Sequence, residues 1–161
     1  MDRAIIEQYL ADATLPARAI EGINNADLHA YPVPDTWSIQ EIVLHLMDSD
    51  LIASERMKRV IVENHPTLVP YDESAFIKEL FCNHLDAHTA CEIFRLNRIM
   101  TASILNRLPD VAFQRSAYHP EKGRLTLAEL VEGYVDHARY HATFIRNKRA
   151  MLGKPVRGAV V

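Results

Sequence analysis

Apolar residues recur every three or four positions along most of this chain, a spacing that is typical of amphipathic helices. The first such segment covers roughly residues 3–12, with these apolar residues on one side: Ile5, Ile6, Tyr9 and Leu10. A second covers about 15–23. It follows Thr14, a residue type that favours helix N-caps, and has Pro16 in its first turn, where proline is tolerated. The two segments predict a first helix that is broken in the middle.

Two capping boxes mark the starts of two long helices. Residues 38–41, Ser-Ile-Gln-Glu, and residues 126–129, Thr-Leu-Ala-Glu, each pair a hydroxyl at the N-cap with a glutamate three positions later. In this motif the hydroxyl accepts a hydrogen bond from the amide of the glutamate, and the carboxylate accepts one from the amide of the N-cap. We therefore expect one helix that ends near Val62 and a last helix that ends near Leu152.

The segment 73–108 contains neither proline nor glycine, so we interpret it as one long helix that Pro109 ends. The stretches before it and after it, including 65–72 and 118–123, contain prolines and are predicted to be loops. Apolar and polar residues do not alternate convincingly over the length of a strand, so no sheet is expected. Three long helices and a broken first one predict an all-α four-helix bundle.

Length and composition are those of one globular domain covering residues 1–161, with a core from about 12 to 150 and a tail over 153–161. The net charge is −3 and the basic residues are scattered, which argues against nucleic acid as a partner. Apolar runs do not approach the roughly 20 residues of a membrane span, and the N-terminus lacks the apolar stretch of a signal peptide. We expect a cytoplasmic protein that does not bind membranes.

Cysteine usage agrees with that location. Cys82 and Cys91 fall in the same predicted helix, nine residues apart, which corresponds to about 13 Å along its axis. A disulfide requires Cα atoms within about 7 Å, so the two thiols are predicted to stay unpaired, as is usual in a reducing compartment.

Two histidines four residues apart, His137 and His141, lie in the predicted last helix and share its apolar face. Histidines at this spacing can direct two imidazole nitrogens toward one cation, and a third from a neighbouring helix completes a site with three protein ligands. His45, in the helix that begins after Ser38, is a candidate for the third. Such a site leaves one coordination position open, as catalytic zinc sites do. The alternative is a pair of buried histidines that bond to tyrosine or backbone.

A rival pair has the same spacing. His84 and His88 are also four residues apart, and Cys91 follows one turn later, so these three could bind a soft divalent ion. A partly exposed pair near a bend in the helix is the simpler interpretation. Spacing by itself does not choose between the two pairs.

Several stretches occur in an order that is informative beyond their spacing: Thr14-Leu15-Pro16 through Ile20-Glu21-Gly22-Ile23, Trp37-Ser38-Ile39-Gln40-Glu41-Ile42-Val43-Leu44-His45, Tyr71-Asp72-Glu73, His119-Pro120-Glu121-Lys122-Gly123, and His137-Ala138-Arg139-Tyr140-His141. Together they resemble the DinB/YfiT-like superfamily of bacterial four-helix-bundle proteins, over about residues 12–150. The resemblance implies a metal triad of His45, His137 and His141, with zinc or nickel as the usual occupant. The pair His84 and His88 has no counterpart in the family pattern.

The resemblance also implies a small-molecule substrate and a homodimer, and the apolar tail Gly158-Ala159-Val160-Val161 is compatible with dimerisation. Family members resemble either transferases that use a low-molecular-weight thiol or metal-dependent hydrolases. We favour a thiol-dependent S-transferase of small electrophiles, with a metal-dependent hydrolase as the alternative. A bundle that binds a metal or ligand without catalysis is the hypothesis from a different class.

The sequence does not identify a general base. Asp48, Glu41 and Asp50 are candidates only because they lie near His45 in the chain. His119 lies in a predicted loop beside Pro120 and Gly123. It could overhang the mouth of the bundle and contact substrate, although an exposed or loop-shaping histidine is the simpler interpretation. Trp37, just before a capped helix, is interpreted as a hydrophobic anchor for that helix.

Overall fold

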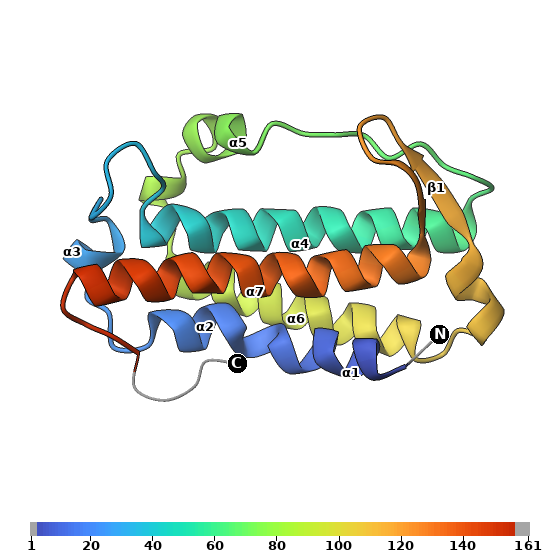
Figure 1. Ribbon diagram of the computed structural model, residues 1–161, viewed down its shortest axis with the longest axis horizontal. Coiled ribbons are helices and arrows are strands. Elements are labelled where there is room, and N and C mark those ends of the chain that lie inside the picture. The colour runs from blue at the N-terminus through green and yellow to red at the C-terminus, as the bar shows by residue number, and fades with distance from the viewer. Residues whose placement is uncertain (1–2, 157–161) are drawn as a thin grey trace.

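The computed structural model describes residues 3–156. These residues form an elongated bundle of four helical rods (Figure 1). The first rod consists of α1 (Ala4–Ala11) and α2 (Leu15–Ile20), and the other three are α4 (Ile39–Val62), α6 (Ala87–Leu105) and α7 (Leu127–Met151). This arrangement confirms the predicted four-helix bundle with a broken first helix.

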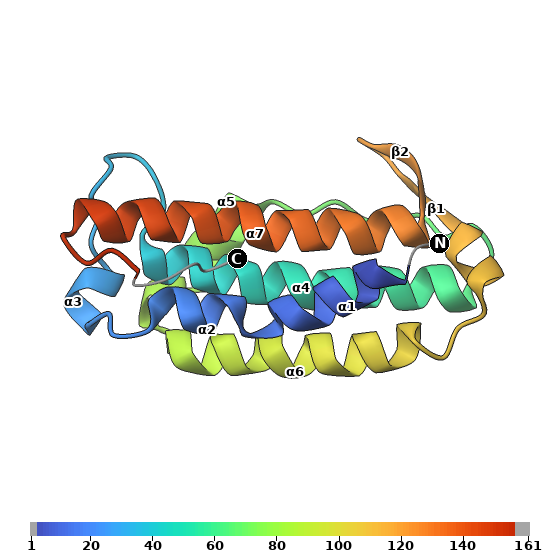
Figure 2. The same cartoon turned by 60° about the horizontal axis from the view of Figure 1, so that its bottom comes forward.

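Two rods run in each direction along the bundle. Figures 1 and 2 show that α4 and α6 run one way, whereas α7 and the first rod run the other way. Because α4 and α6 are parallel, the chain must return along the length of the bundle between them. This return segment carries the short helix α5 (Glu73–Glu79) past the face formed by α4 and α7.

The break in the first rod is a 3₁₀ turn over Asp12–Thr14. Thr14 lies at the N-cap position of α2, as predicted, but its side chain makes no capping hydrogen bond. Pro16 does lie at the start of α2, where its missing amide hydrogen costs nothing. A further short helix, α3 (Asn25–Leu28), interrupts the loop that leads to α4.

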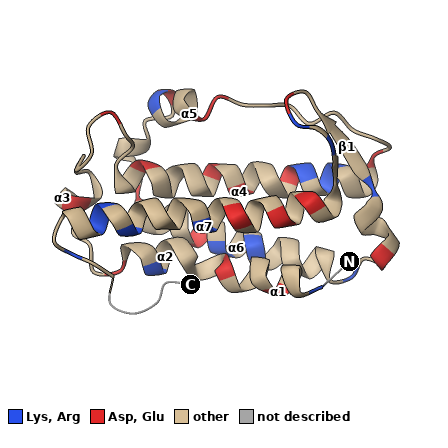
Figure 3. Ribbon diagram, viewed as in Figure 1, with Lys and Arg blue, Asp and Glu red and all other residues tan. Residues whose placement is uncertain are grey.

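Both predicted capping boxes are present. The Ser38 hydroxyl accepts a hydrogen bond from the Glu41 amide at 3.1 Å, and the Glu41 carboxylate accepts one from the Ser38 amide at 2.7 Å. The second box, between Thr126 and Glu129, is reciprocal in the same way. Along α7, acidic residues are grouped toward the N-terminal half and basic residues toward the C-terminal half (Figure 3), a distribution that complements the helix dipole.

The segment 73–108 is not one helix, and that prediction is wrong. After α5 the backbone of Phe81 is left-handed, with φ of 55°, and a 3₁₀ turn over Cys82–His84 follows. Asp86 then caps α6 by accepting a hydrogen bond from the Thr89 amide at 2.6 Å. The break occurs without proline or glycine because a cap at its far side fixes the start of a new helix.

A two-stranded antiparallel hairpin precedes α7, which corrects the expectation that the chain contains no strands. Its strands are β1 (Ser116–His119) and β2 (Gly123–Thr126), with Ser116 opposite Thr126 and His119 opposite Gly123. Four-residue strands are too short to display a persuasive alternation. Gly123 has φ of 74°, a conformation that glycine adopts without strain. Leu68 donates an amide hydrogen bond to the Tyr118 carbonyl at 2.8 Å, which attaches the return segment to the hairpin.

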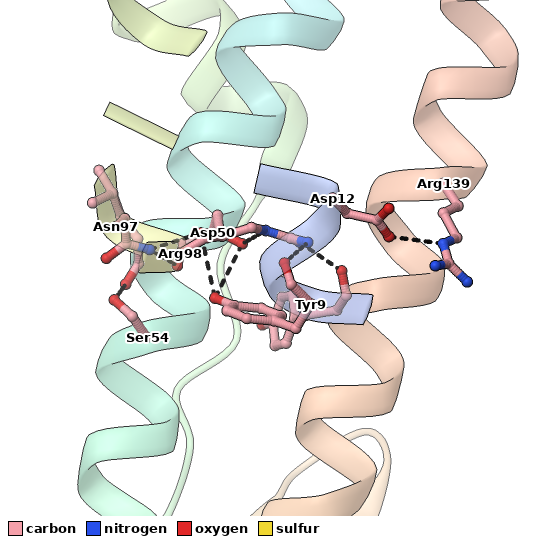
Figure 4. A network of polar contacts seen from close by, with 9 residues as sticks. Tyr9, Asp12, Asp50, Ser54, Asn97, Arg98 and Arg139 are labelled. Atoms are coloured by element: carbon pink, nitrogen blue, oxygen red, sulfur yellow. Dashed lines mark hydrogen bonds and ion pairs between the residues drawn. The ribbon is translucent and has the colours of Figure 1, made fainter. Parts of the chain in front are cut away.

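The interior consists of two apolar clusters, one around the first half of α4 and the second half of α7 and the other at the opposite end of the bundle. Between them lies a buried ion pair, in which Arg98 donates to Asp50 at 2.8 Å (Figure 4). The Arg98 guanidinium lies over the rings of Tyr9 and Phe94. Asn97 also donates to Asp50, at 2.7 Å, so this carboxylate is fully engaged in linking α4 to α6.

Within residues 3–156, no helix is both long and apolar enough to cross a membrane. Cys82 and Cys91 are both free, as predicted, and both are buried. The reason they stay unpaired differs, since they lie on separate elements on either side of the helix break. The tail Gly158–Val161, which we had associated with dimerisation, lies outside the described residues.

Candidate metal centre

Three histidines converge between α4 and α7. His45 lies almost two turns into α4, while His137 and His141 project from successive turns of α7. The facing Nε2 atoms of His45 and His137 are 3.1 Å apart, and one ring nitrogen from each of the three lies within 4.8 Å of the others. Within residues 3–156, no other group of three histidine, cysteine, aspartate or glutamate side chains is close enough to hold an ion.

The shortest of these distances fits two ligands of one tetrahedral cation. Two nitrogens that are each about 2.0–2.1 Å from an ion, at a tetrahedral angle, lie about 3.3 Å apart. The separation between the Nε2 atoms of His45 and His137 is close to this value. In addition, the Nδ1 atom of His141 is buried and has no hydrogen-bond partner among the described residues, so the protein alone leaves a polar atom unsatisfied.

Burial keeps all three imidazoles neutral at physiological pH. Desolvation lowers the pKa of His45 to about 3, assisted by the neighbouring His141 and His137. Desolvation likewise lowers the pKa of His137 to about 3, with smaller effects from His141, Arg98 and Lys122, and lowers the pKa of His141 to about 4. Neutral imidazole is the form that binds a metal, so the donor set suits a divalent cation.

An aromatic side chain closes one side of the triad. The ring of Trp37 lies 4.8 Å from the His45 ring and 6.3 Å from the His141 ring, centroid to centroid, and is stacked on the latter. Trp37 also packs against the apolar cluster around α4, which agrees with its predicted role as an anchor. Its contact with two of the histidines was not foreseen, because the sequence does not reveal how far the ring reaches across to α7.

A polar cavity of about 270 Å³ borders the triad on the side of His137. Its other walls come from α4, the return segment, the hairpin and α7, and include Arg56, Glu73, His119 and Tyr134. The Arg56 guanidinium is buried and donates to the Tyr134 hydroxyl at 2.8 Å. This cavity therefore brings a fixed cation, a carboxylate and hydroxyl groups close to the candidate ligands.

Glu73 is the acidic residue that sequence reasoning missed. Its carboxylate lies 3.9 Å from Nε2 of His45 and is about half exposed in the polar cavity. Partial burial raises the pKa of this carboxyl, while Lys122 and Arg56 oppose the shift. A partial signal was available, because aspartate favours N-caps and Asp72 therefore predicts that a helix begins at Glu73. In the structure Asp72 does cap α5, accepting from the Ala75 amide at 2.9 Å.

None of the three acidic residues proposed near His45 lines this cavity. Glu41 is held in its capping box and also accepts hydrogen bonds from Tyr31 and Asn83. Asp50 is paired with Arg98, and Asp48 is a half-buried residue whose carboxyl has a pKa raised by burial. Their nearness to His45 along the chain does not bring them to the site.

His119 was interpreted as an exposed or loop-shaping residue; it is not exposed, although it does contact its own loop. It is 4% exposed, lies at the end of β1 and faces the polar cavity. Its Nδ1 atom accepts a hydrogen bond from the Glu121 amide at 3.2 Å, so the neutral ring carries its proton on Nε2. Burial lowers the pKa of His119, which favours this neutral form.

The rival histidine pair is separated by the helix break. His84 belongs to the 3₁₀ turn before α6, His88 belongs to α6 itself, and both are exposed. Cys91, the third member of that hypothetical site, is buried, and burial raises the pKa of its thiol to about 12. The shared four-residue spacing is meaningful only when both residues lie on one helix, as they do in α7.

Fold and site together define a class: a four-helix bundle with a candidate metal centre of three histidines on two facing helices. The chain belongs to the DinB superfamily, whose family model matches residues 11–145. A relative from Oceanobacillus iheyensis is 27% identical over 123 residues, which cover 76% of this chain and 71% of the relative. YfiT from Bacillus subtilis is 26% identical over 137 residues, which cover 84% and 77% of the two chains. Both relatives bear the name "putative metal-dependent hydrolase".

The solved structure of YfiT from Bacillus subtilis has the same fold. It superposes with a TM-score of 0.88 and covers 93% of this chain and 86% of its own, at 24% sequence identity. It is described as a probable metal-dependent hydrolase with an unusual four-helix bundle topology.

Proposed function

We propose that this protein is a metal-dependent hydrolase of a small molecule, with His45, His137 and His141 as its metal ligands. The observation that carries the proposal is the convergence of three neutral imidazoles beside a polar cavity that contains a free carboxylate. The names of two relatives, each covering most of this chain, support the same class of activity.

His45, His137 and His141 would hold a divalent ion through imidazole nitrogens alone, so the ion would keep its full positive charge and would supply Lewis-acid chemistry toward a carbonyl or phosphoryl oxygen or toward water. Zinc and nickel both accept imidazole ligands, and we propose one of them as the occupant. Such a site has an open coordination position, whereas structural zinc sites are closed by four protein ligands.

The residues around the polar cavity supply the other parts of a hydrolytic reaction. The Glu73 carboxylate is placed to accept a proton from the attacking water, since it lies within 4 Å of a candidate ligand and is open to the cavity. The Nε2 hydrogen of His119 and the Tyr134 hydroxyl are donors in the same cavity. We assign these two the task of orienting the substrate through its polar atoms.

Thiol-dependent S-transfer, which we favoured from the sequence, is the second candidate and rests on the family resemblance alone. Both cysteines of the chain are buried, and burial raises the pKa of Cys82 to about 11 and that of Cys91 to about 12. A nucleophilic thiol would therefore have to be a separate small molecule. Hydrolysis needs only water and the carboxylate that already lies at the site, so it is the simpler proposal.

The experiment that tests the proposal is a substrate screen with protein reconstituted separately with zinc and nickel. A panel of carboxylic esters, amides and phosphate esters is assayed with and without a low-molecular-weight thiol. We expect thiol-independent hydrolysis that is lost in His141→Ala and unchanged in His84→Ala, which replaces an exposed histidine away from the site. Turnover that requires the thiol would favour S-transfer, and metal binding without turnover of any substrate would favour the non-catalytic hypothesis.

A further inference from the structure

A second cavity borders the histidine triad on the side of His141, and it differs in character from the polar one. It measures about 450 Å³. Its apolar walls come from the loop before α4, from α4 itself and from the last turns of α7, and they include Trp37, Ile42, Phe144 and Met151. A cavity of this size and composition suits a small organic molecule with an apolar body.

Its apolar wall is partly open to solvent. Phe144 is 38% exposed and Met151 is 62% exposed, although both are large hydrophobic side chains. Trp37 is only partly buried, and its inner face packs against the candidate ligands. A ligand that lies against these three side chains would remove apolar surface from water, which is the main source of affinity at such a site.

A buried charged group, Lys148, lies in the wall of this cavity. The residue is 6% exposed, and its ammonium group donates one hydrogen bond, to the Thr36 hydroxyl at 2.6 Å. Within residues 3–156, no carboxylate lies within 4.0 Å of this ammonium group. Buried cations are normally paired, because removing a charge from water is costly. The cavity therefore contains a cation whose partner is missing from the protein.

The acidic groups nearest to Lys148 do not act as that partner. Burial lowers the pKa of Lys148 and the charge of Glu41 opposes this, but the Glu41 carboxylate is committed to the Ser38 cap, Tyr31 and Asn83. Asp35 also lines the cavity, yet it is exposed and lies in the loop at the opening. The interior of the cavity thus favours an anion.

We propose that this cavity binds a small organic carboxylate, with its anionic group against Lys148 and its apolar body between Trp37, Phe144 and Met151. Lys148 follows His141 by seven residues, so both project from nearly the same face of α7 and are about 10 Å apart along the axis. A ligand that spans this distance places its far end at the candidate metal centre.

This pocket also specifies a substrate class, an inference that rests on the proposed hydrolase function. The substrate is an ester or amide that carries a carboxylate at one end and the bond to be cleaved at the other, with an apolar chain or ring in between. The apolar cavity then holds the part of the substrate that does not react. The polar cavity, beside His137, receives the reacting group and water.

Trp37 allows this binding to be measured directly, because it is the one tryptophan of the chain and it lines the cavity. The probe is 4-phenylbutyrate, an aromatic ring joined to a carboxylate by a flexible apolar chain, and its neutral counterpart is 4-phenylbutyramide. Both are titrated into the full-length protein as purified while tryptophan fluorescence is recorded. We expect the carboxylate to bind more tightly than the amide, and equal affinities would overturn the proposal even without any variant.

Lys148→Met removes the charge and keeps the apolar stem, and Lys58→Met is the matched control on an exposed part of α4. We expect Lys148→Met to weaken 4-phenylbutyrate at least about tenfold and to leave the amide unchanged. Lys58→Met should affect neither ligand. An unchanged affinity of Lys148→Met for the carboxylate would contradict the pocket assignment. The titration does not depend on turnover, so its failure is distinguishable from failure of the hydrolase proposal.

Discussion

At the scale of single residues, the site is defined by histidines that the fold keeps neutral. An imidazole in water has a pKa near 6.5, whereas burial lowers the pKa of His45 and His137 to about 3 and that of His141 to about 4. Protons therefore compete with a cation for these nitrogens only in strongly acidic solution. The same shift has a consequence for the stability of the metal-free protein.

As the pH falls below about 6.5, the unfolded chain takes up protons on these three histidines while the folded protein does not. The free energy of unfolding of metal-free protein should therefore decrease between pH 7 and pH 5, by up to about 1.4 kcal/mol per pH unit for each histidine. Denaturant titrations at several pH values measure this slope. His45→Phe should make it shallower, and His84→Gln, at an exposed position, should not. Identical slopes in the wild type and His45→Phe would contradict the burial of a neutral triad.

A second prediction at this scale concerns Glu73. Glu73→Gln keeps the shape of the side chain but removes its ability to accept a proton, so kcat should fall by about 10²–10⁴ while the metal content stays the same. Glu79→Gln, on the same short helix and exposed, is the matched control. Full activity in Glu73→Gln would exclude this carboxylate as the base.

At the scale of elements, the sequence predicts those helix starts that short local motifs determine. It fails to predict breaks that depend on the rest of the fold. The starts of α4 and α7 follow from capping boxes that are complete within four residues. The break before α6 escaped prediction because Phe81 adopts a left-handed conformation that the sequence does not announce. Asp86, followed three residues later by Thr89, was the overlooked signal for a new helix.

The role of Asp86 can be tested by removing its capping side chain. Asp86→Ala should lower the free energy of unfolding by about 1 kcal/mol, because the first amides of α6 lose their acceptor. Metal content should not change, since the triad lies on α4 and α7. If Asp86→Ala instead stabilised the protein and raised its helix content, segment 73–108 would behave as one continuous helix and the break would be wrong.

At the scale of the whole molecule, the bundle is joined at mid-height by a polar contact and not by apolar packing alone. Arg98 is 1% exposed and Asp50 is 2% exposed, and their ion pair connects α6 to α4 while Arg98 also donates to the Tyr134 carbonyl of α7 at 2.8 Å. The sequence showed both residues but could not pair them, because 48 positions separate them along the chain. The triad itself was predicted only with the help of the family resemblance, for the same reason.

Replacing one residue of this ion pair should destabilise the protein more than replacing both. Arg98→Met leaves a buried carboxylate without its cation, so we expect a loss of about 3–5 kcal/mol in the free energy of unfolding. The double replacement Asp50→Leu with Arg98→Met should lose less, because neither charge remains buried alone. Denaturant titrations of the single and double variants measure the difference. The two residues are not coupled if the loss in the free energy of unfolding of the double variant equals the sum of the losses of the two single variants.

The most direct test of the account is the metal content of the purified protein, measured by elemental mass spectrometry on wild type, His45→Ala, His137→Ala and His141→Ala. His84→Ala serves as the control, since it replaces an exposed histidine outside the triad. We expect close to one equivalent of zinc or nickel in the wild type and in the control, and loss of that metal in each of the three triad variants. Metal that survives replacement of any triad histidine, or a wild type that binds none after reconstitution, would contradict a shared site between α4 and α7.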